Sequence, residues 1–150
     1  LASGAPSRTQ LPAGTVLQVV SALYNTETST TSSTYADTGL TATITPTSAT
    51  SKILVLISQN GVRKYSNNTS AGLQVFKNGS LWGIMDYGSG YNNSTNPNGI
   101  GSCSYMAIDS PATTSALTYN TKFASVGNSA GVYVQVNNSE SGIILMEIAA

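Results

Sequence analysis

The chain has 150 residues and carries six Lys or Arg and six Asp or Glu residues, so it has no formal net charge, and its charged fraction of 8% is far below the roughly 25% of ordinary soluble proteins. It contains neither a basic block nor a stripe of basic and aromatic residues, which argues against nucleic acid as a partner. The longest apolar runs, residues 53–57 and 143–146, are much shorter than the roughly 20 residues that span a bilayer, so no membrane insertion is expected. Ser, Thr, Asn and Gly provide the polar coating instead, a composition typical of fibres, adhesins and viral surface proteins.

The domain organisation predicted from the sequence is simple. Residues 1–14 contain Ala, Ser, Gly and Pro without hydrophobic periodicity, and we expect a linker or the end of a stalk there. Residues 15–150 are sufficient for one domain with a substantial core, without disulfides or a structural metal.

Strand-like segments follow one another along the chain, and no segment has a helical period. The expected strands are residues 15–24, 34–45 with a break near Gly39, 52–60, 72–77, 80–86, 102–109, 117–125, 132–136 and 143–148. Asn78-Gly79 predicts a two-residue hairpin, because both residues tolerate a positive φ. The loops at residues 127–131 and 137–142 predict that the last three strands form an antiparallel meander. The fold class expected is all-β, an antiparallel sandwich of about eight to ten strands.

Two strands have apolar residues on both faces. In residues 52–60, Ile53, Val55 and Ile57 alternate with Leu54 and Leu56. The last strand repeats the pattern, and the residues on its second face are Ile144, Met146 and Ile148. Since no helix is expected to cover that face, either another subunit or loops of the same chain must cover it. We favour a homo-oligomer with Leu54, Leu56, Ile144, Met146 and Ile148 in the interface.

The sequence offers little material for catalysis. There is no His, and the single Cys103 has no partner for a disulfide, a thiolate nucleophile or a zinc site, so we expect it to be a small buried filler. The six carboxylates are scattered, and no calcium-loop motif is present. We therefore expect no enzyme, metal or cofactor, although two carboxylates at a suitable separation would suffice for a glycosidase.

Five segments, in this order, resemble the C-terminal domains of phage tail fibres, and the pattern is also similar to the jelly roll of C1q and tumour necrosis factor. They are residues 39–46 (GLTATITP), 51–58 (SKILVLIS), 73–79 (LQVFKNG), 109–120 (DSPATTSALTYN) and 142–148 (GIILMEI). The resemblance implies a trimeric jelly-roll head at the distal end of a fibre on the virion surface, fed by an upstream stalk, with loops that contact the host. It transfers no functional residue by position.

Candidate receptor-binding residues come instead from composition, because tyrosine rings together with amides suit sugar recognition. Residues 86–101 form the longest expected irregular stretch, and their candidates are Tyr87, Tyr91, Asn92, Asn93, Asn96 and Asn98. A second loop is expected at residues 62–71, with the candidates Arg63, Lys64, Tyr65 and Asn67. The two could lie side by side, because hairpin ends cluster at the poles of a sandwich. Trp82 is expected to be an anchor of the core or of an interface.

Three functions remain open at this point. The first is a homotrimeric tail-fibre head that binds a bacterial cell-surface glycan or protein. The second is a capsid decoration or fibre-capping protein with the same trimeric fold. The third is a glycan-degrading enzyme.

Overall fold

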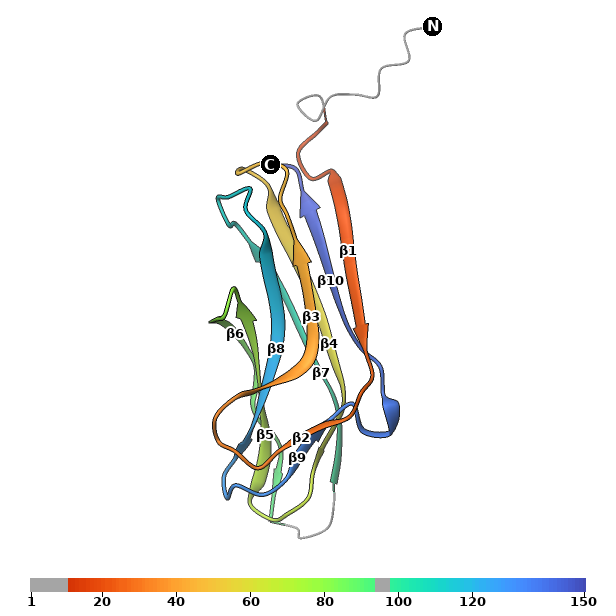
Figure 1. Ribbon diagram of the computed structural model, residues 1–150, viewed down its shortest axis with the longest axis vertical. Helices are drawn as coiled ribbons and strands as arrows, with labels where there is room; N and C mark the ends of the chain where they lie inside the picture. Colours follow the sequence, from red (N-terminus) through yellow and green to blue (C-terminus); the bar gives the residue numbers. More distant parts are fainter. Residues whose placement is uncertain (1–10, 94–97) are drawn as a thin grey trace, which may run out of the picture.

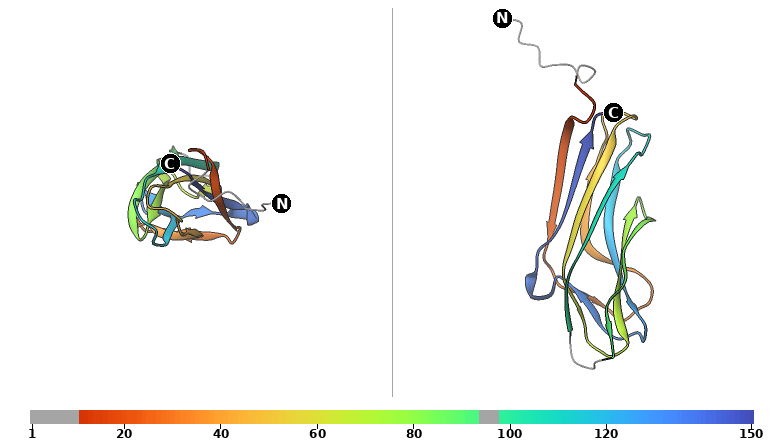
Figure 2. Two further views of the ribbon diagram at one scale, coloured as in Figure 1. Left: turned by 90° about the horizontal axis from the view of Figure 1, so that it is seen from above. Right: turned by 180° about the vertical axis from the view of Figure 1, so that it is seen from behind.

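Two antiparallel sheets packed face to face make up the computed structural model, which describes residues 11–93 and 98–150 (Figure 1). Sheet A contains β1 (Val16–Tyr24), β10 (Ser141–Ile148), β4 (Lys52–Lys64), β7 (Asn98–Asp109), β9 (Val132–Val134) and β2 (Thr28–Thr30). Sheet B contains β3 (Ala36–Ile44), β8 (Leu117–Val126), β5 (Thr69–Lys77) and β6 (Ser80–Asn92). Figure 2 shows the two layers from above and from behind. The described residues include no helix that is long and apolar enough to cross a membrane.

The strand order is that of a jelly roll. Sheet A runs β1-β10-β4-β7 and sheet B runs β3-β8-β5-β6, so the chain passes repeatedly from one sheet to the other. Two interleaved Greek keys of this kind define the jelly roll. The predicted all-β sandwich of jelly-roll type is therefore confirmed.

The predicted C-terminal meander is wrong. Strand β8 lies in sheet B, whereas β9 and β10 both pair with β4 in sheet A. The turn after β9 contains three left-handed residues, Gln135 (φ 56°), Asn137 (φ 57°) and Asn138 (φ 58°). They redirect the chain, so that β9 and β10 occupy successive stretches along one edge of β4 instead of pairing with each other.

Strict alternation of side chains fills the space between the sheets. In β4, Ile53, Val55 and Ile57 point inward and are almost completely buried. They pack in one cluster with residues of β3, β8 and β10, and Trp82 of β6 is packed against that cluster, as expected for an anchor of the core. A second cluster, which includes Leu73 and Phe123, fills the other half of the sandwich.

A buried polar layer lies between the two apolar clusters. The amide of Gln59 accepts a hydrogen bond from Thr121 Oγ1 (2.8 Å) and donates one to Ser141 Oγ (2.9 Å). Thr38 joins through Thr121 Oγ1 (2.5 Å), and Gln135 donates to Ser141 Oγ (3.3 Å). All five residues are fully buried, so the layer connects both sheets through bonds that have no competition from water.

Two predicted backbone features are confirmed. Asn78 (φ 49°) and Gly79 (φ 82°) form the two-residue turn between β5 and β6. Strand β3 has a register shift between Asp37 and Thr41, where the break was expected, and Gly39 has φ 91°. A Cβ at Gly39 would overlap the ring of Tyr24, so only glycine fits this bulge.

Glu147 forms a group of hydrogen bonds at the end of the sandwich where the first and last described residues lie. Its carboxylate is buried on the inner face of β10 and accepts hydrogen bonds from Thr47 N (2.7 Å), Thr47 Oγ1 (2.6 Å) and Gln18 Nε2 (2.6 Å). Burial alone raises the pKa of Glu147, but the hydrogen bonds from Thr47, Gln18 and Ser51 outweigh it and lower this pKa from 4.5 to about 2. The ionised carboxylate therefore holds the loop between β3 and β4 against β1 and β10.

The polar layer predicts that Gln59→Leu lowers the free energy of unfolding by about 1–3 kcal/mol, because Thr121 and Ser141 each lose a partner in a buried site. Urea unfolding at pH 7 measures this loss. Ser58→Ala, on the exposed side of the same strand, is the control and should change stability by less than about 0.5 kcal/mol. If both variants had the same free energy of unfolding, the hydrogen bonds of Gln59 would not stabilise the fold as predicted.

The lowered pKa of Glu147 predicts an acid-sensitive fold. Its contribution is fully present above the pKa of the unfolded chain, near 4.5, and is lost as the pH falls toward about 2. Unfolding free energies between pH 6 and pH 2 should therefore fall less steeply for Glu147→Gln than for the unchanged protein, with a difference of about 3 kcal/mol over this range. Glu140→Gln, at an exposed position, should retain the steep profile.

Candidate functional site

The sandwich has two chemically different ends. The base is the end where Gly14 N donates to Ala149 O (2.8 Å) and Ala149 N donates to Thr15 O (2.8 Å). The distal pole is the opposite end, which carries the turn between β4 and β5 and the connection between β8 and β9 (Figures 1 and 2). Both predicted receptor-binding segments approach this pole, since β6 ends and β7 begins there as well.

The two segments are less irregular than predicted. Strand β6 continues to Asn92 and β7 begins at Asn98, so most of residues 86–101 is strand. Strand β4 likewise continues to Lys64 and β5 begins at Thr69. Expecting long loops there was wrong, because a Gly-, Ser- and Asn-rich sequence at a sheet edge can still be fixed in a ladder by its neighbours.

The predicted proximity of the two segments is confirmed by direct contacts. Tyr91 OH donates to Asn68 Oδ1 (3.2 Å), and Thr69 pairs with Asn92 in the ladder of β5 and β6. Because one hydroxyl and one amide already meet, the turn between β4 and β5 and the end of β6 form a single surface.

A third segment, residues 127–131, also belongs to this pole and was missed. Asn128 Nδ2 donates to Asn67 O (2.6 Å), and Asn128 Oδ1 accepts from Thr69 Oγ1 and from Ala130 N (3.2 Å). The sequence showed only a turn there, and no local pattern could have shown that its asparagine reaches residues some sixty positions away.

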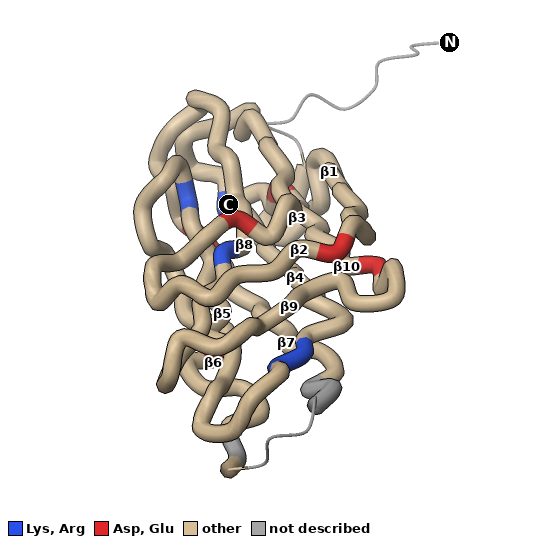
Figure 3. The backbone as a smooth tube through the Cα atoms, turned by 60° about the horizontal axis from the view of Figure 1, so that its bottom comes forward, with Lys and Arg blue, Asp and Glu red and all other residues tan. Residues whose placement is uncertain are grey.

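Aromatic side chains adjoin the three turns. The rings of Tyr65 and Tyr133 have centroids 4.7 Å apart at a tilt of 53°, and the guanidinium of Arg63 lies 4.8 Å from the centroid of Tyr65. Tyr65 is 41% exposed, and Tyr65 N donates to Gly131 O (3.0 Å). The pole therefore presents tyrosine rings and several amides. Few Lys, Arg, Asp or Glu residues lie along its backbone (Figure 3).

The predicted receptor-binding residues differ in their accessibility. Tyr65, Tyr87, Tyr91 and Asn93 are exposed, and Arg63 and Asn67 are half-buried. Lys64 is fully buried, with Nζ donating to Ser66 O (3.0 Å), so a receptor cannot reach it in this fold. The reason is the inward position of Lys64 on β4, two residues after the buried Val62. Asn96 lies outside the described residues, as do the side chains of Asn92 and Asn98, although both belong to strands.

The predicted interface residues share one surface, the outer face of sheet A. Leu56 pairs with Ile144 on one side and with Met106 on the other. Leu54 pairs with Met146 and Ile108 in the next row. Ile148 continues this face toward the base. No described element covers it: Met106 is 77% and Ile108 64% exposed. Whether a second subunit covers the face stays a prediction.

A hollow of about 320 Å³ lies within this face. Its lining is almost wholly apolar and includes Leu23, Leu56, Met106 and Ile144. The outer face of sheet B is different, because Asn120 Nδ2 donates to Asp37 Oδ1 (2.7 Å) and Lys122 lies 3.7 Å from the same carboxylate. The two outer faces of the sandwich are therefore chemically distinct.

The described residues contain no cluster of three or more His, Cys, Asp or Glu that could hold a metal ion. The carboxylate of Asp109 accepts hydrogen bonds from Lys77 Nζ (2.8 Å) and Tyr119 OH (2.6 Å), so its partners are residues of the fold itself. Cys103 is buried as predicted, and burial raises the pKa of its thiol, which the contact with Ser89 only partly offsets.

The contacts of Asn128 predict that Asn128→Ala loosens the distal pole. Loss of the bonds to Asn67 and Thr69 should speed amide hydrogen exchange at residues 66–70 and lower the unfolding free energy by about 1 kcal/mol. The control is Ser129→Gly, an exposed neighbour with φ 58° that glycine tolerates. Unchanged exchange in Asn128→Ala would contradict the role assigned to this side chain.

No family model and no curated protein matches the chain. Among solved structures, it is similar to a VP2 subviral particle of infectious bursal disease virus, with 9% identity over 88% of the chain and a TM-score of 0.48. It is also similar to the Gx strain structure of that virus (12% identity over 100%, TM-score 0.43) and to its T=1 particles (11% over 89%, TM-score 0.41). The chain spans only 32%, 38% and 36% of those chains. Because these TM-scores are below 0.5, the fold assignment depends on the strand order of the chain itself.

Proposed function

We propose that this chain is the receptor-binding head of a virion surface fibre. In this proposal it assembles as a homotrimer through the outer face of sheet A and recognises a glycan or protein of the host surface with its distal pole. The observation that carries the proposal is the division of one small domain into an uncovered apolar face and a pole rich in tyrosine and asparagine.

The position of the pole supports a role at the tip. The described chain enters at the base, and the turns with Tyr65, Asn68 and Asn128, together with the end of β6 that carries Tyr91, lie at the other end of the long axis (Figure 1). A stalk joined through the N-terminal side would leave these turns furthest from the particle. Tyrosine rings and amides recognise sugar rings and hydroxyls without relying on charge.

Two apolar surfaces of different shape support a cyclic assembly. One is the outer face of sheet A with its hollow, and the other is the edge strand β6, where Leu81, Ile84 and Tyr87 are more than half exposed. The strands that carry them are neighbours at one side of the sandwich, because Trp82 of β6 contacts Tyr105 of β7 with ring centroids 5.7 Å apart. A twofold pairing of sheet faces would leave the β6 edge uncovered, whereas edge-to-face contacts around a ring cover both surfaces. Three subunits are the number that the resemblance to fibre heads implies.

Trimerisation would also compensate for the low affinity expected of a single shallow surface with few charges. Three identical poles on one axis would bind a repetitive glycan with an avidity that exceeds the affinity of one site by orders of magnitude.

The assembly part of the proposal predicts that Met106→Glu produces a folded monomer. A carboxylate in the centre of an apolar interface is left desolvated and unpaired. Light scattering after size exclusion should give three times the chain mass for the unchanged protein and one chain mass for Met106→Glu. Thr43→Glu puts the same charge on the exposed side of sheet B and should remain trimeric. A monomeric unchanged protein would contradict this part of the proposal.

Adsorption tests the function itself. Particles without this domain should fail to adsorb to host cells, and the isolated domain should bind those cells and compete with particles. Normal adsorption combined with a less stable capsid would indicate a decoration protein instead. Release of reducing ends from host polysaccharide would indicate a glycan-degrading enzyme.

A further inference from the structure

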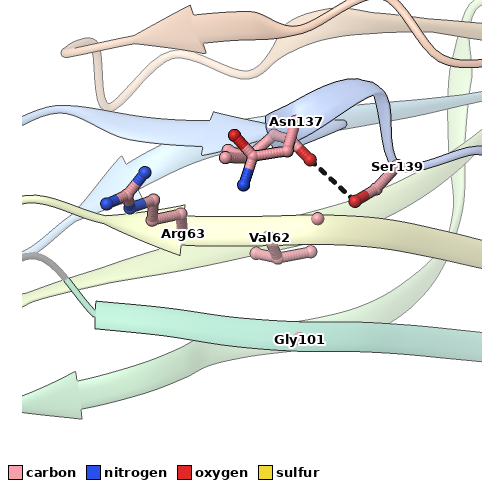
Figure 4. Close-up of a pocket in the computed structure, with 7 residues that line it drawn as sticks. Val62, Arg63, Gly101, Asn137 and Ser139 are labelled. Carbon is pink, nitrogen blue, oxygen red and sulfur yellow. Dashed lines mark hydrogen bonds between the residues drawn. The ribbon is translucent and has the colours of Figure 1, made fainter.

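A pocket of about 280 Å³ opens on sheet A between the apolar face and the distal pole, and no role has been assigned to it so far. Three elements line it: β4 with Gly61, Val62 and Arg63, β7 with Gly101, and the short turn η2 (Val136–Asn138) with the following Ser139. Figure 4 shows Asn137 beside Arg63 on one side of β4, and Gly101 on β7 on the other. The volume suits one sugar residue, at the lower limit of typical ligand pockets.

A close approach of η2 to β4 fixes the shape of this pocket. A Cβ at Gly61 would lie 2.5 Å from Val136 N and 2.8 Å from Ser139 Cβ, so only glycine permits this packing. Gln135 N donates to Asn60 O (2.9 Å), and Ser139 Oγ donates to Val136 O (2.7 Å). The left-handed backbone of Asn137 then turns its amide outward. The pocket is thus formed before any ligand binds, which reduces the entropic cost of binding.

Arg63 supplies a cation that pairs with no carboxylate of the described residues. Within residues 11–93 and 98–150, ion pairs join Lys77 to Asp109 and Lys122 to Asp37, whereas the guanidinium of Arg63 lies over the ring of Tyr65. The stacked position orients the guanidinium and leaves its N–H donors available. The exposed side-chain amide of Asn137 makes no hydrogen bond to a described residue either, so its donors and acceptor are available beside Arg63.

We propose that this pocket binds a carboxylate-bearing sugar residue, such as a uronic acid, of a host surface polysaccharide. The guanidinium of Arg63 pairs with the sugar carboxylate, and the amide of Asn137 binds ring hydroxyls. This inference rests on the proposed receptor-binding function and assigns a substrate class to one part of it.

The chemistry of the lining favours an acidic sugar over a neutral one. A planar guanidinium matches a carboxylate with two parallel hydrogen bonds, and such charge-assisted bonds are about twice as strong as neutral ones. A neutral sugar would leave the N–H donors of the Arg63 guanidinium without an anionic partner. The amide of Asn137 and the hydroxyl oxygen of Ser139, which donates its proton to Val136 O, also line the pocket and are suited to the polyhydroxylated ring that carries the carboxylate.

Calorimetric titration of the unchanged protein with a glucuronate-containing tetrasaccharide, and with a neutral glucose tetrasaccharide, tests the inference. The acidic sugar should bind at least tenfold more tightly, and Arg63→Gln should abolish this preference. Asn137→Gly retains the left-handed backbone and removes only the amide, so it should weaken binding several-fold. The matched control is Asn138→Gly, at an exposed residue with the same backbone conformation that does not line the pocket, and its affinity should be unchanged.

Equal binding of the two tetrasaccharides, or full retention of the preference in Arg63→Gln with unchanged molar mass, would overturn the inference. Competition by inorganic phosphate as strong as by free glucuronate would also overturn it, because the pocket would then be a general anion site. The failure of the proposed function looks different: the unchanged protein would not bind host cells at all. If Arg63→Gln does not change cell binding, the proposed fibre-head function is retained and the proposed acidic-sugar site is contradicted.

Discussion

The hydrogen-bonded layer around Gln59 is the constraint on which the rest of this sandwich depends. Apolar side chains alone tolerate many relative positions of two sheets, whereas a buried amide must meet its partners with defined geometry. Gln59 connects Thr121 of sheet B with Ser141 of sheet A. The same Ser141 hydroxyl accepts from Asn60 N (2.9 Å), at the point where β4 leaves β10 and approaches η2. The layer thus fixes both the distance between the sheets and the place where sheet A changes partners.

This change of partners divides β4 into two functional halves. Before it, the outer side chains are Leu54 and Leu56, next to β10 and β7. After it, the outer side chain is Arg63, next to β9, and Tyr65 follows directly after the end of the strand. A single strand therefore carries both the surface assigned to assembly and the surface assigned to recognition. The bulge at Gly61 separates them, so that each half can change without disturbing the register of the other.

Much of the fold could be predicted because local patterns and tertiary packing agree. The alternation in β4, the Asn78-Gly79 turn and the two-sided apolar character of β10 each depend on a few neighbouring residues. Sequence patterns did not predict the features that depend on residues far away in the sequence. The ends of β6 and β7 are strands because other strands hold their backbones, despite glycines and asparagines that favour turns. The burial of Lys64 follows from the register shift of β4 between Gln59 and Val62, and the pocket beside Arg63 depends on where η2 docks. No pattern near residue 63 contains that information.

The pairing of β1 with β10 has a mechanical consequence. The strands run along the axis that joins the base to the distal pole, and the hydrogen bonds between them lie across it. Tension between a particle at the base and a cell at the pole would pull β1 lengthwise against β10. Bonds loaded in this way share the force and break together, whereas bonds at the end of a peeled hairpin break one after another. Under the proposed function, the same ladder that closes the sandwich would resist the load of a particle tethered to a cell.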